Sequence, residues 1–316
     1  MKLCIVVPCY NESEVLPETV KRLTEKMSVL TDSGKLESGS KIVFVDDGSK
    51  DGTWELIEKY RLEFESVEGI KLSRNRGHQN ALFAGLMTVK DGFDAVVSMD
   101  ADLQDDIDAV DEMLEKYDGG CDIVYGVRKS RKKDSVFKRT TAVLFYKMMR
   151  WMGAETVYNH ADYRLMSRRA LDALENFGEV NLFLRGLVPL IGFKSDTVYY
   201  DRGSRFAGKS KYSFGKMLGF AFEGITSLSV RPIQIIIRLG VLLSLFGTVV
   251  LVYSLVQHFL AHTEAGWTSI MASVWTIGGL QMTAIGVIGK YIGKIYLETK
   301  ARPRFIIEKN TLEDER

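Results

Sequence analysis

The chain is poor in cysteine, which excludes a small scaffold held together by disulfides or by a zinc finger. Its 316 residues include three cysteines, Cys4, Cys9 and Cys121, with no CxxC pair and no metal-finger spacing. An odd and sparse set of this kind fits a reducing compartment. The net charge of only +1 likewise gives no reason to expect nucleic acid as a partner.

The sequence also lacks a recognisable leader, internal repeats and low-complexity tracts. The segment Met1–Pro8 is too short and too soon followed by polar residues to be a signal peptide, so we expect the polar part of the chain to stay in the cytosol. Apolar residues make up 46% of the chain but are unevenly spread. Charges crowd the first two-thirds, whereas residues 233–289 are mostly apolar.

The first half of the sequence alternates short apolar runs with helix-length amphipathic stretches. The runs that predict strands are Leu3–Val7, Lys41–Val45, Ile70–Leu72, Ala95–Met99 and Ile123–Tyr125, with a late strand at 194–200. Helical spacing lies between them, at Glu12–Leu30, Thr53–Tyr60, Asn80–Thr88 and Ile107–Tyr117. Alternation of this kind, with nearly all-apolar strands, predicts an α/β fold around a buried, mainly parallel sheet.

Two long apolar stretches near the C-terminus predict a membrane hairpin. Leu239–Phe259 and Ile270–Ile288 are uncharged, and a helix of about 20 residues crosses a hydrocarbon core of about 30 Å. The preceding segment, Ser213–Val230, gathers its apolar residues on one side and predicts an amphipathic helix lying along the membrane surface. The alternatives are a buried core hairpin for the two stretches and a core helix for Ser213–Val230.

The basic residues orient this hairpin. The connecting segment His258–Thr268 has no Lys or Arg, whereas both outer flanks are basic, so the positive-inside rule puts both termini and the polar domain on the cytoplasmic side of the cytoplasmic membrane. Glycines such as Gly278, Gly286 and Gly293 indicate close helix packing within one chain or in a homo-oligomer. We predict a cytoplasmic domain at 1–212, an interfacial helix at 213–231, two transmembrane helices within 232–297 (about 235–260 and 268–290) and a cytoplasmic tail at 298–316, whose last residues, Glu308–Arg316, are expected to be disordered.

The most informative polar motif is Asp100-Ala101-Asp102-Leu103-Gln104, which follows the predicted strand Ala95–Met99. Ligands of open α/β sheets bind beyond the carboxyl ends of the strands. A short turn here can bring both carboxylates near one Mg²⁺ or Mn²⁺ ion, and Gln104 can add a neutral oxygen. The alternative is an acidic turn in which Asp102 or Asp105 caps the next helix.

Two further polar turns are expected at the same edge of the sheet. Pro8-Cys9-Tyr10-Asn11-Glu12 follows the first predicted strand, and Asp46-Asp47-Gly48-Ser49 follows the second. The face of Tyr10 can stack on a nucleobase, and Asp46 or Asp47 can accept a hydrogen bond from a base or a ribose. Ordinary turn and cap chemistry is the alternative for both segments.

Taken together, the motifs resemble a known family. VVPCYNE, VDDGS-DGT, SRNRGHQNALFAGL and MDADLQD stand in the order seen in inverting GT-A glycosyltransferases of the dolichol-phosphate mannosyltransferase type. With two C-terminal membrane helices, the chain looks most like the bacterial undecaprenyl-phosphate (bactoprenol) glucosyltransferase branch. The resemblance covers nearly the whole chain.

The resemblance implies roles for individual residues. Asp100, Asp102 and Gln104 would hold the divalent metal on the donor diphosphate. Arg205 and Lys211, in a loop resembling the family's RxxGxSKY sequence, would close over the donor phosphates and offset the charge on the leaving diphosphate. The donor pocket as a whole would be formed by Pro8, Tyr10, Asn11, Glu12, Asp46, Asp47, Asp100, Ala101, Asp102, Arg205 and Lys211.

The acceptor side is expected downstream. By resemblance, Arg128 and Arg139 would clamp the acceptor phosphate, although the basic run Lys129–Arg139 would also be attracted to anionic lipid headgroups. Asp162 is the best candidate base. A phosphate monoester is already mostly ionised at pH 7, because its second pKa is about 6, so Asp162 would orient such an acceptor rather than deprotonate it. A salt bridge to Arg164 is the alternative role.

One departure narrows the expected function. Processive polysaccharide synthases of the same superfamily carry QxxRW, but the nearest match here is Lys147-Met-Met-Arg150-Trp151. We therefore expect transfer of a single sugar, with inversion, from a nucleotide sugar to a polyprenyl phosphate. UDP-glucose is the default donor, and UDP-N-acetylglucosamine, UDP-galactose and GDP-mannose are the other options. The alternatives are transfer to a lipid-linked hydroxyl and a catalytically silent nucleotide-binding membrane scaffold.

Overall fold

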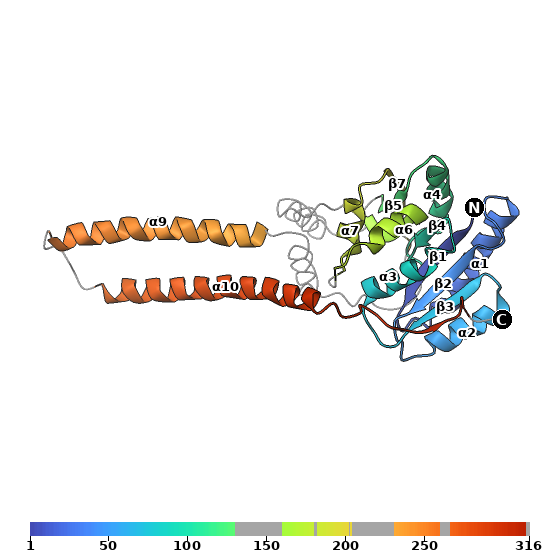
Figure 1. Ribbon diagram of the computed structural model, residues 1–316, viewed down its shortest axis with the longest axis horizontal. Helices are drawn as coiled ribbons and strands as arrows, with labels where there is room; N and C mark the ends of the chain where they lie inside the picture. Colours follow the sequence, from blue (N-terminus) through green and yellow to red (C-terminus); the bar gives the residue numbers. More distant parts are fainter. Residues whose placement is uncertain (130–159, 180–181, 202, 204–230, 260–265, 314–316) are drawn as a thin grey trace.

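An eight-stranded mixed sheet with helices on both faces forms the body of the protein (Figure 1). The computed structural model describes residues 1–129, 160–179, 182–201, 203, 231–259 and 266–313. The sheet order is β7-β5-β6-β4-β1-β2-β3-β8. The strands are β1 (Leu3–Cys9), β2 (Lys41–Asp46), β3 (Val67–Leu72), β4 (Ala95–Ser98), β5 (Ile123–Arg128), β6 (His160–Ser167), β7 (Ser195–Tyr200) and β8 (Ile307–Asn310). The helices are α1 (Leu16–Asp32), α2 (Thr53–Glu63), α3 (His78–Val89), α4 (Ala109–Asp118), α6 (Arg168–Glu175), α7 (Leu184–Leu190), α9 (Arg231–Phe259) and α10 (Trp267–Thr299).

The parallel centre of the sheet is buried on both faces, as its apolar strands predict. Strands β4, β1, β2 and β3 run parallel, and alternate residues of β1 enter two different cores. Leu3 and Ile5 pack with α1, α2 and α4, whereas Cys4 and Val6 pack with α3, α6 and α7. The predicted α/β class is therefore confirmed, and the parallel strands end at one common edge.

Strand β6 interrupts the parallel order. It lies antiparallel between β4 and β5, and it carries Asp162 and Arg164 into the centre of the sheet, where both are buried. Because β6 contains ionisable residues, its sequence does not predict a central strand. The pairing of β6 with β4 brings Asp162 next to the end of β4, where the turn formed by Asp100-Ala101-Asp102 (the DAD turn) begins.

The part of the tail that the structure describes, residues 308–313, is ordered, contrary to our prediction of a disordered tail from Glu308. After α10 the chain returns to the sheet, and β8 pairs antiparallel with β3. Thr311 is buried; its Oγ1 donates to Glu68 Oε2 at 2.6 Å and accepts from the Gly69 N–H at 2.8 Å. The tail therefore forms the edge strand of the sheet next to β3. The sequence of β8 is too short and polar to predict a strand.

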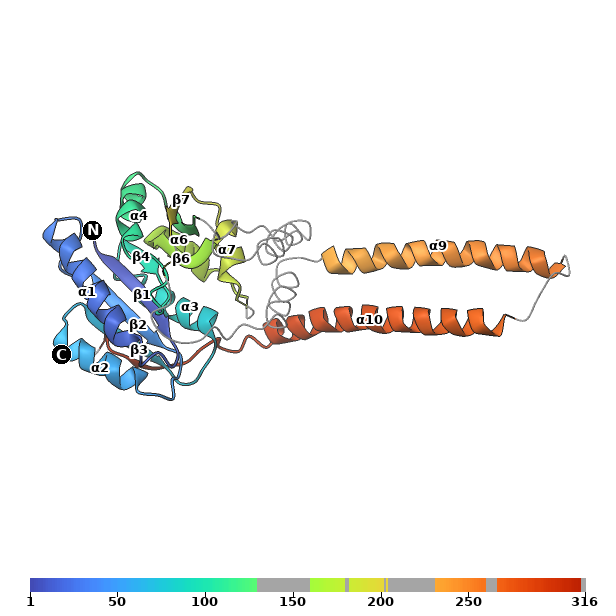
Figure 2. The same cartoon turned by 180° about the vertical axis from the view of Figure 1, so that it is seen from behind.

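The two longest helices leave the sheet domain as an antiparallel pair (Figures 1 and 2). Helix α9 has 29 residues and α10 has 33, and both expose apolar side chains such as Ile237, Phe246, Ile285 and Ile292. In the part of the chain that the structure describes, no helix reaches the length and apolarity needed to cross a membrane. The predicted interfacial helix at 213–231 lies outside the described residues, apart from Arg231.

Candidate active site

A pocket of about 660 Å³ lies at the carboxyl edge of the sheet. It is formed by the turns after β1 and β4, the N-terminal turn of α3, the ends of β5 and β6, and α7. The described residues that line it are Pro8, Glu12, Arg76, Gly77, His78, Gln79, Asn80, Asp100, Ala101, Asp102, Arg128, Asp162 and Arg185. The sequence predicted that three polar turns would meet at this edge. The turns after β1 and β4 line the pocket, whereas the turn after β2 does not line it and instead binds the main chain of Arg76 and Gly77, which do.

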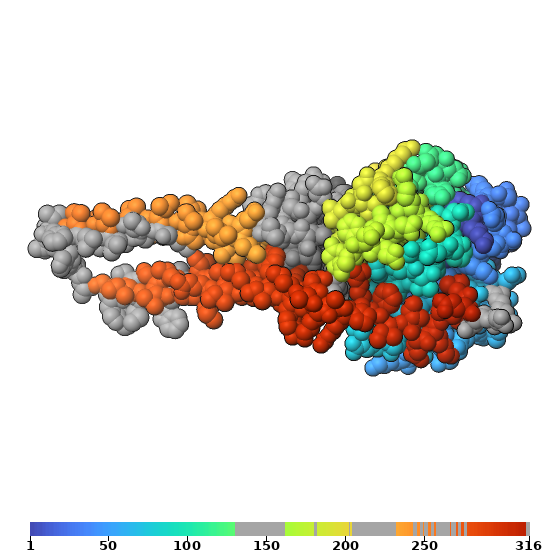
Figure 3. Space-filling model, in the orientation of Figure 1, coloured from blue at the N-terminus to red at the C-terminus, as the bar shows by residue number. Residues whose placement is uncertain are grey.

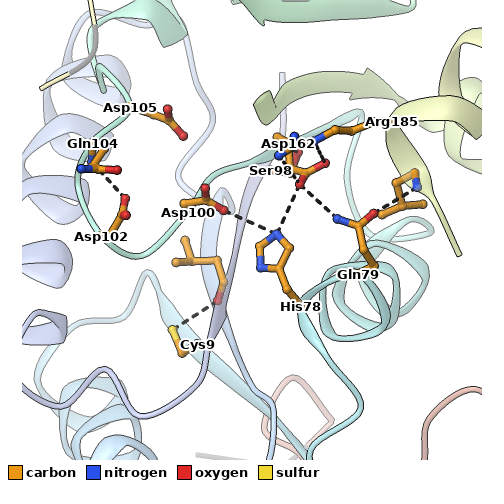
Figure 4. Close-up of polar contacts among 12 residues, drawn as sticks. Cys9, His78, Gln79, Ser98, Asp100, Asp102, Gln104, Asp105, Asp162 and Arg185 are labelled. Carbon is orange, nitrogen blue, oxygen red and sulfur yellow. Dashed lines mark hydrogen bonds and ion pairs between the residues drawn. The ribbon is translucent and has the colours of Figure 1, made fainter. Parts of the chain in front are cut away.

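The DAD turn places two carboxylates in the pocket. Asp100 and Asp102 both line it, and Leu103, with a φ of 56°, turns the chain sharply after them. The Gln104 N–H donates to Asp102 Oδ1 at 3.2 Å (Figure 4). Gln104 lines a neighbouring pocket together with Asp105 and is not among the described residues that line this one; its role as a metal ligand stays a prediction.

The protein groups available to a metal are therefore few. Within the described ranges, no three His, Cys, Asp or Glu side chains converge on one point that would hold an ion. Two carboxylates fit Mg²⁺ or Mn²⁺ nevertheless, since these ions commonly take one or two protein carboxylates and complete their shell with water and substrate phosphates. The donor set of the DAD turn therefore suits an ion that arrives with a diphosphate.

Asp100 has an acidic environment that favours a cation. Burial raises its pKa to about 6; His78 opposes this shift, and Asp105, Asp162 and Asp102 add to it. His78 Nε2 lies 3.5 Å from Asp100 Oδ1 and 3.5 Å from Asp162 Oδ2 (Figure 4). Burial alone would lower the pKa of His78, but the hydrogen bond to Asp162 and the charge of Asp100 raise it.

Asp162 is surrounded by cations and donors. Its carboxylate contacts Arg164 Nη2 at 2.6 Å, Arg185 Nη2 at 3.0 Å and Gln79 Nε2 at 3.0 Å. Although burial alone would raise its pKa, Arg185, His78 and Arg164 hold that pKa well below its usual range. A carboxylate with so low a pKa is a poor proton acceptor at neutral pH, so the structure favours the salt-bridge role over the catalytic base that we considered.

Gln79 extends this network to α7. Its side-chain Oε1 accepts a hydrogen bond from the Leu184 N–H at 3.0 Å while its Nε2 donates to Asp162. Arg164, which is 1% exposed, also donates to the Leu184 carbonyl. Asp162 therefore ties the central strand β6 to α3 and α7, and it fixes the wall of the pocket that faces the DAD turn.

Arg128 lies at the end of β5 and lines the pocket, as expected of an acceptor-binding residue. Its Nη2 lies 3.3 Å from Asp105 Oδ1, and its Nε donates to the Tyr200 hydroxyl at 3.3 Å. The Tyr200 hydroxyl in turn donates to the same Asp105 oxygen at 2.5 Å. Asp105 and Tyr200 therefore hold the guanidinium of Arg128 in place at the pocket wall.

The aspartates after β2 face main-chain amides. Asp47 accepts from the Arg76 and Gly77 N–H groups at 2.6 and 2.8 Å, and Asp46 accepts from the Ser49 N–H at 3.2 Å. Burial raises the pKa of both carboxyls. Neither is among the described residues that line the pocket. Their hydrogen bonds to main-chain N–H groups instead hold the loop after β3 and the turn after β2 in place.

The turn after β1 is joined to the same loop. The Asn11 N–H donates to Ser49 Oγ at 2.9 Å, and Asn11 Oδ1 accepts from the Lys50 N–H at 2.8 Å. Pro8 and Glu12 line the pocket, whereas Tyr10 is 41% exposed beside it. An exposed ring at this position remains available for the predicted stacking on a base.

Sequence reasoning missed one wall of the pocket. His78, Gln79 and Asn80 begin α3 directly after β3, and Arg185 lies in α7. The RGHQN sequence follows β3, which ends at the same edge of the sheet, so its position could have predicted that His78, Gln79 and Asn80 line the pocket. Arg139, Arg205 and Lys211 lie outside the described residues, and their predicted roles stay predictions.

Comparison with known proteins decides the family. Residues 4–175 match the model of glycosyl transferase family 2, which covers more than half of the chain. The chain belongs to glycosyl transferase family 2. The resemblance drawn from the sequence motifs is therefore confirmed, and this glycosyltransferase carries its family region on the sheet domain described above.

Near full-length relatives agree with this assignment. The glycosyltransferase is 53% identical over 306 residues to the uncharacterized glycosyltransferase YkoT of Bacillus subtilis strain 168, covering 97% of this chain and 91% of the relative. It is 36% identical over 315 residues to the SfII prophage-derived bactoprenol glucosyl transferase of Shigella flexneri, covering 98% of each chain. The mannosyltransferase PcManGT of Pyrobaculum calidifontis, solved with GDP-Man and Mn²⁺, shares the fold with a TM-score of 0.50 at 16% identity over 92% of this chain and 87% of that one.

Proposed function

We propose that this glycosyltransferase transfers one sugar from a nucleoside diphosphate donor to the phosphate of a polyprenyl lipid. The observation that carries the proposal is the pocket that Asp100, Asp102 and Arg128 line together. A carboxylate pair suits a metal-bound diphosphate, and a guanidinium suits an anionic acceptor. The 36% identity to a bactoprenol glucosyl transferase over 98% of both chains supports the lipid phosphate as the acceptor.

The donor half of the pocket would hold the nucleotide sugar. Asp100 and Asp102 would hold a Mg²⁺ or Mn²⁺ ion, which neutralises the diphosphate and makes it a better leaving group when bound. Pro8 and Glu12 would contact the nucleotide from the turn after β1, with Tyr10 stacking on the base. Arg205 and Lys211 are proposed to cover the diphosphate. UDP-glucose is our default donor.

The reaction would be one in-line displacement. An oxygen of the lipid phosphate forms a bond to the anomeric carbon while the bond from that carbon to the diphosphate oxygen breaks, and the electron pair leaves with the diphosphate. Attack from the opposite face inverts the centre, so an α-linked donor gives a β-linked product. Arg128, with Arg139, would hold the attacking phosphate, and most of the rate comes from positioning and charge stabilisation.

Asp162 would act as a positioning residue in this scheme. An acceptor that is already ionised needs no base, and a carboxylate held by Arg164 and Arg185 has little tendency to take up a proton. Its contacts with His78 and Gln79 would keep the wall of the pocket in place. Because a hydroxyl acceptor would need a base and Asp162 is paired with Arg164 and Arg185, these two contacts favour a phosphate acceptor over a hydroxyl acceptor.

The α9–α10 pair is our proposed membrane attachment. Its support is the row of exposed apolar side chains, including Leu245, Val249 and Ile288, together with the basic flanks in the sequence. Both termini and the sheet domain would then lie on the cytoplasmic side, and the glycines of α10 would pack within the chain or in a homo-oligomer. Retention of the protein in membranes after salt and alkaline carbonate washes tests this; release by salt alone would contradict it.

A transfer assay on membranes containing the protein tests the function. Radiolabelled UDP-glucose, UDP-N-acetylglucosamine, UDP-galactose and GDP-mannose would each be offered with undecaprenyl phosphate, with and without Mg²⁺ or Mn²⁺. We expect metal-dependent label in the lipid fraction from wild type and from the control Asp118→Ala, an exposed carboxylate at the end of α4, but none from Asp102→Ala. Nucleotide binding without lipid label from any donor would overturn the proposal.

A further inference from the structure

A separate pocket, of about 400 Å³, lies where α10 joins the sheet domain. Four arginines line it: Arg74 and Arg76 from the loop after β3, and Arg302 and Arg304 from the segment after α10. The other described lining residues are Asn80, Leu297 and Pro303, so this lining contains no carboxylate. We call this cavity the arginine pocket.

Both walls of the arginine pocket are held by contacts inside the protein. The loop wall is fixed by Asp47, which binds the Arg76 and Gly77 N–H groups, and by Gly48, where a Cβ would come within 2.7 Å of the Arg74 carbonyl carbon. The Ser73 N–H donates to the Ile306 carbonyl at 3.0 Å, which joins this wall to the tail.

The tail wall is anchored on α3 and on the residues after α6. Arg304 Nη2 donates to the Phe177 carbonyl at 2.5 Å, and its guanidinium lies 4.7 Å from the centre of the Phe83 ring. Phe305 makes an edge contact with the same ring at 6.4 Å. Figure 3 shows the tail packed over α3 on the surface that continues from α10. The arginines are therefore gathered by defined packing between segments far apart in the sequence.

The charge balance of the arginine pocket favours an anion. Glu179 and Glu298 act on Arg304 from outside the lining, and Asp47 binds the main chain of the loop wall. The lining itself carries four guanidinium groups and no carboxylate. The buried Nε of Arg76 has no hydrogen-bond partner within the described part of the protein. Guanidinium groups clustered in this way match the oxygens of a phosphate, to which they donate strong charge-assisted hydrogen bonds.

The position of the arginine pocket indicates where its ligand comes from. Arg76 and Asn80 line both this pocket and the candidate active site, and Leu297 brings the last turn of α10 to its rim. Resting on the proposed function, in which α9 and α10 lie in the membrane, we propose that the arginine pocket binds the phosphate of a membrane lipid. The ligand class is a lipid phosphate, either the monoester of the polyprenyl acceptor or the diester of an anionic phospholipid.

Direct binding tests this without relying on catalysis. The purified full chain would be titrated with farnesyl phosphate and, separately, with short-chain phosphatidylglycerol, with phosphatidylcholine of equal chain length as the neutral reference. The test variant is Arg74→Gln/Arg302→Gln, because both side chains are exposed. The matched control is Arg168→Gln/Lys300→Gln, which removes two exposed charges outside the pocket. Arg74→Lys/Arg302→Lys keeps the charges and serves if the first variant does not fold.

The outcomes separate the two sources. Farnesyl phosphate binding at least tenfold weaker than in the control assigns the acceptor phosphate; the same loss for phosphatidylglycerol assigns a phospholipid headgroup. The lysine variant keeps the charges but loses the bidentate guanidinium groups, so its lipid binding should weaken less than that of the glutamine variant. That intermediate result supports the same site. Unchanged binding of both lipids in the glutamine variant, or in the lysine variant if it alone folds, overturns the proposal. Binding that depends on the arginines, together with no sugar transfer to any acceptor, would reject the proposed function alone.

Discussion

Two carboxylates meet the same histidine from neighbouring strands, Asp100 after β4 and Asp162 in β6, each 3.5 Å from His78 Nε2. Around Asp162, Arg185, His78 and Arg164 hold the pKa well below its usual range although burial opposes them, and the neutral Gln79 donates a hydrogen bond to the carboxylate. Around Asp100, burial and three further aspartates raise the pKa to about 6. Within one pocket, the protein therefore compensates the charge of Asp162 more fully than the charge of Asp100, which suits the proposed cation beside Asp100.

Removal of the Asp100 charge is expected to have the largest effect on activity. Asp100→Asn should lower transfer by at least about 100-fold, because the proposed metal on the donor diphosphate would lose a ligand. The metal-free protein should become more stable by at most on the order of 1 kcal/mol, since a repelled charge that is only partly buried is gone. Sugar transfer and denaturant unfolding of the same preparation would measure both, with Asp118→Asn as the control. Lower stability together with full activity would break the comparison.

Removal of the Asp162 charge should act mainly on stability. Asp162→Asn leaves Arg164 buried beside a neutral group, and breaking such a buried pair costs about 3–5 kcal/mol. Chemical unfolding would measure this loss. The control Asp196→Asn breaks an exposed pair with Lys116 at 2.9 Å and should cost at most about 1 kcal/mol.

The activity of folded Asp162→Asn separates a positioning role from a base. If Asp162 only positions the wall, the folded fraction should keep transfer within about tenfold of wild type, with an unchanged pH profile between pH 6 and 8. A near-complete loss of kcat in a protein that remains folded would instead assign the proton-accepting role and move the acceptor toward a hydroxyl.

Asp47 offers an intermediate case. Asp47→Asn keeps one acceptor oxygen but places an amide group near the Arg76 or Gly77 N–H, so we expect a loss of about 1–3 kcal/mol. Because Arg76 and Gly77 line the pocket, KM for the donor should rise more than kcat falls. An unchanged donor KM would show that this loop does not shape the donor site.

The smallest expected effect is on pH dependence. The pKa of Asp100 is raised, so its protonated form is favoured in the folded protein from about pH 4 up to about pH 6, and ionisation above that range opposes folding in the absence of metal. Mn²⁺ affinity should therefore be about twofold lower at pH 6 than at pH 8 and fall further below pH 6. Asp162, with its lowered pKa, contributes stability above about pH 4 that is lost only in stronger acid. Mn²⁺ titration by calorimetry across this range would check the sign, and affinity that rises toward acid pH would contradict it.

Much of the fold could be predicted from local sequence patterns. Apolar runs predicted β1 to β5 and β7 within a few residues, and the position of DAD after a buried strand predicted that Asp100 and Asp102 share a pocket. Periodicity succeeds here because the parallel strands are buried on both faces. The same logic failed for β6, whose polar residues are satisfied by groups far away in the sequence.

Long-range partners account for what sequence could not predict. Nothing near Thr311 indicates that its hydroxyl would meet Glu68 across the sheet, so the ordered tail was missed. The resemblance made Asp162 a candidate base; the sequence around it does not show that Arg185 would pair with it, or that Gln79 would donate to it, from two other helices. Gln104 was expected on the metal; after the turn at Leu103 it lines the neighbouring pocket, and its metal role stays a prediction.

The most direct test is transfer of labelled sugar from the donor panel to undecaprenyl phosphate by wild type, Asp100→Asn and Asp118→Asn in matched membranes. We predict metal-dependent lipid label from wild type and Asp118→Asn, and at least about 100-fold less from Asp100→Asn. Equal label from all three proteins, or none from wild type with any donor, would contradict the assignment of this pocket as the site of transfer to a lipid phosphate.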